Sequence, residues 1–154
     1  MIKQCVNGNR IIDFLPVHAN GTLPVGDPSI PLTAALYVMQ HERQFLLVYN
    51  TKRNQWESVS GGIDPGETPV QTAVREVWEE SSQRIKQPQA LGLVKFYIHA
   101  TDSTEYFAFY HTRLDALRPF VANEETTRMT LWTPNDVLDD RHGDLSQWAI
   151  GTIV

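Results

Sequence analysis

Three glutamates, Glu76, Glu79 and Glu80, follow a glycine-rich turn and share one predicted helix. Because an α-helix advances about 100° per residue, their carboxylates fall within an arc of roughly 100°. Like charges spaced three or four residues apart destabilise an isolated helix. Such a cluster implies a counter-charge, and ligands that are all oxygen favour a hard divalent cation such as Mg²⁺. The spacing therefore predicts a metal site for phosphate chemistry.

The glycine turn and the helix together resemble the signature of the Nudix hydrolases. That signature reads glycine, five residues, glutamate, seven residues and then R-E-U-x-E-E-x-G-U, where U is aliphatic. The last two positions depart from it, since Ser82 replaces the glycine and Gln83 replaces the aliphatic residue. A motif match of this kind predicts a structural context as well as a chemistry. The positions that match are Gly61, Glu67, Arg75, Glu76, Val77, Glu79 and Glu80.

The resemblance implies a role for each carboxylate. Glu76 and Glu80 are expected to be direct ligands of Mg²⁺, with Mn²⁺ as an alternative ion. Glu79 is expected to be a further ligand or to act on metal-bound water. A backbone carbonyl just before the signature also binds the metal in this family, and here it belongs to Ser60. Because that ligand is main-chain, a change of side chain at this position need not matter.

Glu67 and Arg75 are expected to support the site rather than to react. The resemblance implies an ion pair between them that holds the turn against the helix. An arginine fork on a carboxylate is geometrically rigid, which suits such a role. Gly61 is interpreted structurally as well, as part of a turn that needs unusual backbone angles and close backbone approach.

The general base is expected outside the signature. In some relatives it is a glutamate on a loop ahead of a late strand, and Glu124 and Glu125 in ANEETTRMTLW are the candidates here. Glu105, on a predicted strand, is a weaker third candidate. Exposed glutamates on loops are usually only solvated. Whether one of these side chains lies close to the metal site therefore decides whether it can be the base.

The elements that position these residues follow from local patterns. Thr68 is a predicted N-cap with Pro69 at the first helical position. Because Ser82 lacks the easy left-handed conformation of glycine, we expect a shifted helix end or a different following loop. Mixed strands and helices indicate an α/β fold, and the resemblance implies a Nudix-type α/β/α sandwich with a central mixed β-sheet. Strands are predicted over 2–6, 10–17, 32–40, 44–50, 56–60, 90–99, 104–112 and 128–133, and further helices over 134–138 and 145–153.

Composition limits the class of protein. The 154 residues are expected to form a single Nudix domain over 1–154. A net charge of −5 argues against a nucleic-acid polymer as partner. The sequence leaves a homodimer possible. The lone Cys5 and the lack of a long apolar run favour a cytoplasmic protein without a membrane partner. Five scattered histidines lack metal-ligand spacing and are interpreted as surface or strand residues.

The resemblance implies Mg²⁺-dependent hydrolysis of a pyrophosphate bond in a nucleoside diphosphate-linked small molecule. Nucleoside triphosphates, including oxidised ones, are the first expectation. The stretch QWESVSGGIDPGE resembles pterin-triphosphate hydrolases, while nucleotide sugars and dinucleotides stay open. The alternative is a catalytically silent module that binds a nucleotide or a protein. This alternative is supported by the departures from the family's pattern at Ser82, Gln83 and Ser60. The intact carboxylates argue against that alternative, and no substrate-binding residue is assigned.

Overall fold

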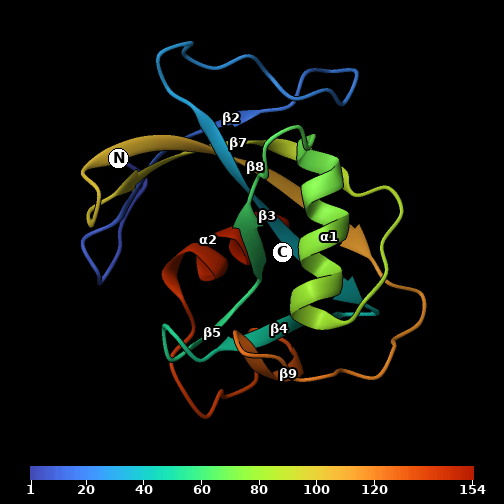
Figure 1. Ribbon diagram of the computed structural model, residues 1–154. Coiled ribbons are helices and arrows are strands. Elements are labelled where there is room, and N and C mark those ends of the chain that lie inside the picture. The colour runs from blue at the N-terminus through green and yellow to red at the C-terminus, as the bar shows by residue number, and fades with distance from the viewer.

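One sheet of nine strands and two helices make up the computed structural model, which describes residues 1–154 (Figure 1). The helices are α1 (Pro69–Ser81) and α2 (Asp144–Ile153). Neither is long and apolar enough to cross a lipid bilayer. The strands are β1 (Lys3–Gln4), β2 (Arg10–Pro16), β3 (Leu32–His41), β4 (Gln44–Asn50), β5 (Gln55–Glu57), β6 (Val59–Gly62), β7 (Gln89–Ile98), β8 (Ser103–Arg113) and β9 (Thr126–Trp132).

The sheet is mixed, as predicted. Its strand order is β1-β2-β7-β8-β3-β4-β5, with β6 paired to β3 and β9 paired to β4. β3 runs parallel to β8, whereas the other strand pairs are antiparallel. β3 is therefore the central strand, and six consecutive residues from Ala35 to Gln40 are buried. A strand covered on both faces is expected to show such a continuous buried run.

The two helices cover opposite faces of this sheet. Successive side chains of a strand point to opposite faces, and the core of the protein divides accordingly. Tyr37 of β3 packs in one cluster with Val77 of α1. The neighbouring Leu36 packs in the other cluster with Ile150 of α2. The predicted α/β/α sandwich is confirmed.

Helix α1 begins where the sequence predicts. Thr68 has an extended backbone, and its Oγ1 accepts a hydrogen bond of 3.2 Å from Gln71 N. The Gln71 side chain accepts in return from Thr68 N at 2.9 Å, which completes a capping box. Removing an N-cap of this kind costs about 1 kcal/mol of stability. The cap fixes the start of the helix that carries the signature glutamates.

The end of α1 bears on the first of the two alternatives expected there, a shifted helix end. The helix end is not shifted, because Ser82 itself adopts the left-handed conformation with φ 63° and donates its N–H to Trp78 O at 3.0 Å. A non-glycine residue in this conformation costs roughly 1–2 kcal/mol. The Oγ of Ser82 offsets part of that cost, since it accepts a 3.0 Å hydrogen bond from Val121 N. The serine therefore takes the place of the family's glycine.

Two predicted elements are wrong in detail. Residues 134–138 form a turn, not a helix, because the Asp136 carboxylate folds back to accept from Thr133 N at 2.9 Å. The predicted strand 56–60 is divided at Ser58, whose N–H donates to Ser146 Oγ of α2 at 2.9 Å. His142 also departs from expectation: it is buried outside any strand and bonds Ser146 Oγ at 2.8 Å. The remaining strands and the terminal helix are confirmed with small changes at their ends.

Candidate active site

Glu76 and Glu80 lie one helical turn apart on α1, and both are buried, with 9% and 3% of their surface exposed. α1 packs against β6, so the two side chains lie over the glycine turn. A Cβ atom built on Gly61 would overlap the carboxyl group of Glu76. The absence of a side chain at Gly61 therefore creates the space in which this carboxylate lies.

Glu80 is an unsatisfied buried acid. Its Oε2 atom is buried and has no hydrogen-bond partner. Burial, followed by the hydrogen bond and the negative charge of Glu76, raises the pKa of Glu80 to about 10. A buried charge without a partner is strongly unfavourable, so the pair holds a proton or requires a cation. This arrangement has the electrostatic character of a cation site.

Arg75 joins the glycine turn to the helix. Its Nε and Nη2 donate to Glu67 at 2.7 and 2.9 Å, and its Nη2 also donates to Gly62 O at 3.0 Å. Its Nη1 donates to Glu76 Oε1 at 2.9 Å. The hydrogen bonds from Arg75 are the main reason that the pKa of Glu67 is lowered to about 2. The ion pair expected between Arg75 and Glu67 is present, and it reaches Glu76 as well.

Glu79 lies apart from the buried pair. More than half of its side chain is exposed, and its carboxylate accepts from Arg75 Nη1 at 3.2 Å. No three His, Cys, Asp or Glu side chains surround a common point in the structure. Mg²⁺ nevertheless fits the residues present, because it needs only one or two carboxylates and retains several waters. Glu76 and the unpartnered oxygen of Glu80 are buried oxygen donors of the kind that this ion takes.

The loop before β9 brings Glu125 to the carboxylate pair. Thr126 Oγ1 donates to Glu80 O at 2.7 Å, and Asn123 Oδ1 accepts from Glu125 N at 2.9 Å. The charge of Glu125 contributes to the raised pKa of Glu80, and Glu125 is half-buried whereas Glu124 is exposed. Glu125 is therefore the better placed of the two predicted base candidates.

The comparisons with known proteins agree with this geometry. The profile of the NUDIX domain matches residues 30–149, which is most of the chain and includes the whole of β6 and α1. The chain belongs to the Nudix family. The sheet order, the glycine turn and the buried glutamate pair are thus the family's fold and signature as they occur in this member.

Individual Nudix proteins resemble the chain to different extents. The dihydroneopterin triphosphate diphosphatase of Haemophilus influenzae is 31% identical over 78 residues, which covers 51% of this chain and 46% of that protein. The pyrophosphohydrolase of Bacillus subtilis superposes with a TM-score of 0.72 at 16% identity, covering 98% of this chain and 90% of that one. The dihydroneopterin triphosphate pyrophosphohydrolase of E. coli gives 0.62 at 20% identity, covering 80% and 97%.

The Nudix site also contains an arginine that the sequence reading missed. Arg53 donates from Nε and Nη2 to Glu57 at 2.7 and 2.9 Å, and Glu57 belongs to β5 beside the glycine turn. The hydrogen bonds that Arg53 donates to Glu57, and the charges of Glu57, Glu125 and Glu80, raise the pKa of Arg53. The sequence does show an arginine and a glutamate four residues apart, which is a spacing typical of an ion pair. It does not show that Arg53 lies near Glu80, because that depends on the tertiary structure.

Other candidates lie away from this Nudix site. Glu105 is bound by Ser103 Oγ at 2.8 Å on β8, and no contact joins it to Glu76 or Glu80. It therefore becomes a useful control residue rather than a base candidate.

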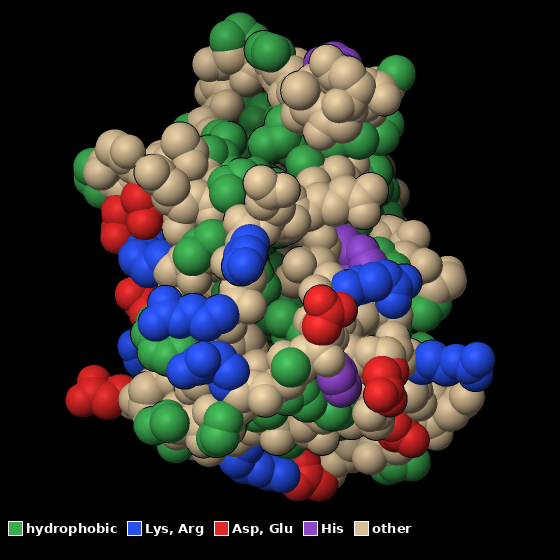
Figure 2. All heavy atoms as spheres, turned by 90° about the vertical axis from the view of Figure 1, so that its right-hand side faces the viewer, with side chains coloured by type: hydrophobic (Ala, Val, Ile, Leu, Met, Phe, Trp, Pro, Cys, Tyr) green, Lys and Arg blue, Asp and Glu red, His purple; other side chains and the backbone are tan.

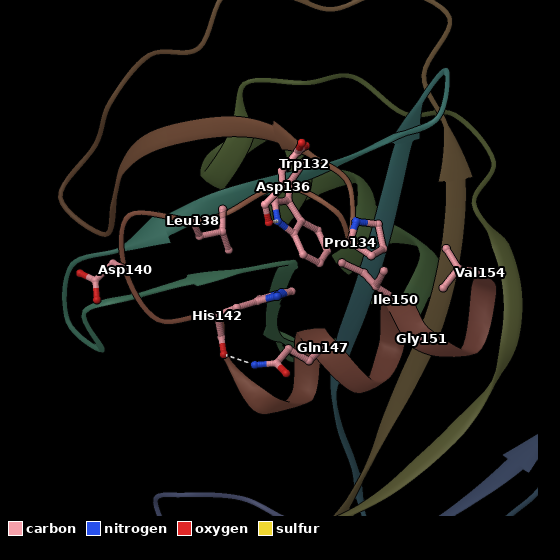
Figure 3. A pocket seen from close by; sticks show the side chains of 10 residues that line it. All are labelled: Trp132, Pro134, Asp136, Leu138, Asp140, His142, Gln147, Ile150, Gly151 and Val154. Atoms are coloured by element: carbon pink, nitrogen blue, oxygen red, sulfur yellow. Dashed lines mark hydrogen bonds between the residues drawn. The ribbon is translucent and has the colours of Figure 1, made fainter.

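A separate pocket of about 500 Å³ lies against α2 and contains none of the signature glutamates (Figure 3). Trp132 and Leu138 point towards its middle, whereas Asp140 points away. Its lining includes no Lys or Arg, so it offers no counter-charge to a phosphate. Phosphate chemistry is therefore assigned to the Glu76–Glu80 site. The pocket is lined by Trp132, Pro134, Asp136, Leu138, Asp140, His142, Gln147, Ile150, Gly151 and Val154.

Proposed function

We propose that this Nudix chain is a Mg²⁺-dependent pyrophosphohydrolase acting on a nucleotide-type small molecule. The observation that carries the proposal is the unpartnered, buried Oε2 of Glu80 beside the carboxylate of Glu76. A purely structural helix gains nothing from such a pair, since each buried charge lowers stability unless it is compensated. The pair is best explained by a cation that binds there during function.

Glu76, Glu80 and the Ser60 carbonyl would hold the ion, with Mn²⁺ as an alternative. When bound, it would neutralise phosphate oxygens and lower the pKa of water. Arg75 orients Glu76 through its hydrogen bond and so keeps that carboxylate directed at the site. Glu125 would act as the general base, accepting the proton of the water that attacks phosphorus while the phosphoanhydride bond breaks.

Glu124 and Glu79 are second choices for the base. Glu124 lies next to Glu125 but is exposed. Glu79 is exposed and held by Arg75, and it would need to turn towards the site to act on water. Substitution of either glutamate by glutamine tests whether that residue is the base.

The substrate is expected to carry a di- or triphosphate on a heterocyclic group. Nucleoside triphosphates follow from the signature, and a pterin triphosphate is favoured by the named activity of the Haemophilus relative. Arg53 is the cation beside the carboxylates that could contact the substrate's phosphates. Basic side chains gather on one part of the face drawn in Figure 2. Near the end of α1, the guanidinium groups of Arg84 and Arg118 lie over the Trp78 ring.

The test is a phosphate-release panel with Mg²⁺. Normal and oxidised nucleoside triphosphates, dihydroneopterin triphosphate, a nucleotide sugar and a dinucleotide are compared for the wild type, Glu80→Gln, Glu79→Gln and Glu125→Gln. We expect turnover of at least one triphosphate and a loss of about 100-fold or more in kcat for Glu80→Gln and Glu125→Gln. Glu105→Gln serves as the control with unchanged activity. Binding of a nucleotide without turnover would instead identify a silent Nudix module.

A further inference from the structure

The last turn of α1 is bonded along its length to the loop that precedes β9. Asn123 Nδ2 donates to Glu79 O at 2.9 Å, and Thr126 Oγ1 donates to Glu80 O at 2.7 Å. Ser82 and Gln83, the two residues that depart from the Nudix signature, add further hydrogen bonds between the end of α1 and this loop. The departures thus occur where the helix meets the segment that carries Glu125.

Gln83 makes the most extensive of these contacts. Only 1% of its surface is exposed, although glutamine is ordinarily a surface residue. Its Oε1 accepts from Arg118 N at 2.9 Å, and its Nε2 donates to Arg118 O at 2.9 Å. The same Nε2 donates to Ser81 O at 3.1 Å. The amide thereby pairs with both backbone groups of Arg118, as a neighbouring strand would.

An aliphatic residue could fill this position but could not replace the bonds. The Arg118 N–H and C=O would lose these partners, and the two lost hydrogen bonds would release residue 118 from the end of α1. Ser82 adds the bond from Val121 N at 3.0 Å. Residues 114–125 contain no helix or strand, so these side chains are among the few groups that fix their path.

The loop is also fixed from its other side. Thr51 N donates to Glu125 O at 3.0 Å, and Thr51 Oγ1 bonds the carbonyls of Glu124 and Glu125. Glu125 therefore lies between two anchors, one on the turn after β4 and one at the end of α1. The anchor on α1 depends on side chains that the signature does not require.

We propose that Gln83, together with Ser82, is a positioning residue that fixes residues 118–126 and thereby holds Glu125 at the carboxylate pair. This inference rests on the proposed function, since Glu125 is the base only if hydrolysis occurs. Under this proposal Ser82 and Gln83 have a function, although they depart from the Nudix signature.

The test compares Gln83→Met, which retains length and loses the amide, with Gln40→Met. Gln40 is a buried glutamine of β3 whose side chain is bonded to His111 Nε2 of β8 at 2.8 Å. Its backbone carbonyl accepts from Leu114 N, but the substituted amide is bonded to β8 and not to residues 118–126, so the same chemical change is made outside the proposed contact. We expect Gln83→Met to lower kcat by about ten-fold or more, with KM and Mn²⁺ affinity within about two-fold of wild type. Gln40→Met leaves kcat within about two-fold. Amide hydrogen exchange of residues 118–126 rises only in Gln83→Met.

The decisive comparison is the double variant Gln83→Met with Glu125→Gln. If Gln83 acts through Glu125, the double variant has the same kcat as Glu125→Gln alone. Independent losses that multiply would overturn the proposal, as would wild-type kcat in Gln83→Met. Should Gln83→Met fail to fold, Ser82→Gly removes only the bond from Val121 N. Ser82→Gly is expected to lower kcat by itself but to cause no further loss when it is combined with Glu125→Gln. An unchanged kcat in Ser82→Gly would refute the positioning role. An inactive wild type would instead refute the proposed function.

Discussion

At the scale of single residues, Gly61 decides whether the carboxylate pair can exist. Its position in β6 faces the Glu76 carboxyl group so closely that no Cβ atom fits. The neighbouring Gly62 is different, because a Cβ there would meet only Thr33 O at 3.9 Å. Two adjacent glycines thus have unequal importance, although both belong to β6. The interpretation of Gly61 as part of a turn with unusual backbone angles is wrong, because Gly61 pairs with Ala35 in the sheet and glycine is required there by the close approach of Glu76.

We predict that Gly61→Ala displaces Glu76 and weakens Mn²⁺ binding by about 100-fold, because half of the carboxylate donor set moves. Electron paramagnetic resonance titration with Mn²⁺ measures this without relying on turnover. Gly62→Ala is the matched control and retains wild-type affinity. Equal affinities in the two variants would contradict the placement of Glu76 against Gly61.

Local spacing explains why this part of the site could be predicted. Glu76 and Glu80 are four residues apart on one helix, and Thr68 marks its start, so sequence alone places them together. Arg53 and Gln83 could not be predicted to contribute. Their partners lie across the tertiary structure, and no local pattern shows that Arg53 approaches Glu80 or that Gln83 pairs with Arg118.

At the scale of elements, α2 is attached to the sheet through a buried polar contact. Ser146 Oγ lies within 2.9 Å of both Ser58 N and Ser58 Oγ, and His142 Nε2 bonds the same Oγ at 2.8 Å. Burial, with a smaller contribution from Lys3, lowers the pKa of His142 to about 4. This contact also divides β5 from β6. The sequence does not predict this contact, since its patterns favour a helix over 134–138 and a surface or strand position for His142.

We predict that acid weakens the attachment of α2. Unfolded histidine titrates near pH 6.5, so between about pH 6.5 and 4 the unfolded state binds a proton that the folded state does not. Stability is therefore complete above this window and falls as the pH decreases through it. Between pH 7 and 5 the wild type should lose about 2 kcal/mol relative to His142→Gln. Urea unfolding of both proteins at the two pH values measures this, and parallel losses would contradict it.

At the scale of the whole molecule, the site couples metal binding to stability. An ion that binds the folded chain alone raises the free energy of unfolding by about 2.7 kcal/mol at 100 times its dissociation constant. For a chain of 154 residues this corresponds to a rise in Tm of roughly 5–10 °C. Without the ion, Glu80 must take up a proton or remain an uncompensated buried charge, and either cost lowers the stability of the metal-free protein.

We predict that Mg²⁺ raises the Tm of the wild type by this amount and leaves Glu80→Gln unchanged. The variant should also be at least as stable as the wild type in EDTA, since an uncompensated buried acid has been removed. Differential scanning calorimetry with and without Mg²⁺ provides the measurement, and Glu105→Gln should retain the full shift. An equal Mg²⁺ response in Glu80→Gln would show that the ion binds elsewhere.

The parallel pairing of β3 with β8 has a consequence for how the protein comes into being. All of β4, β5, β6, α1 and β7 lie in the chain between these two neighbouring strands. Pairing across so long a separation requires closure of a large loop and slows folding. During synthesis the centre of the sheet cannot form until β8 has left the ribosome. Until then the nascent chain already contains the helix that carries Glu76 and Glu80, but not the complete sheet against which that helix packs.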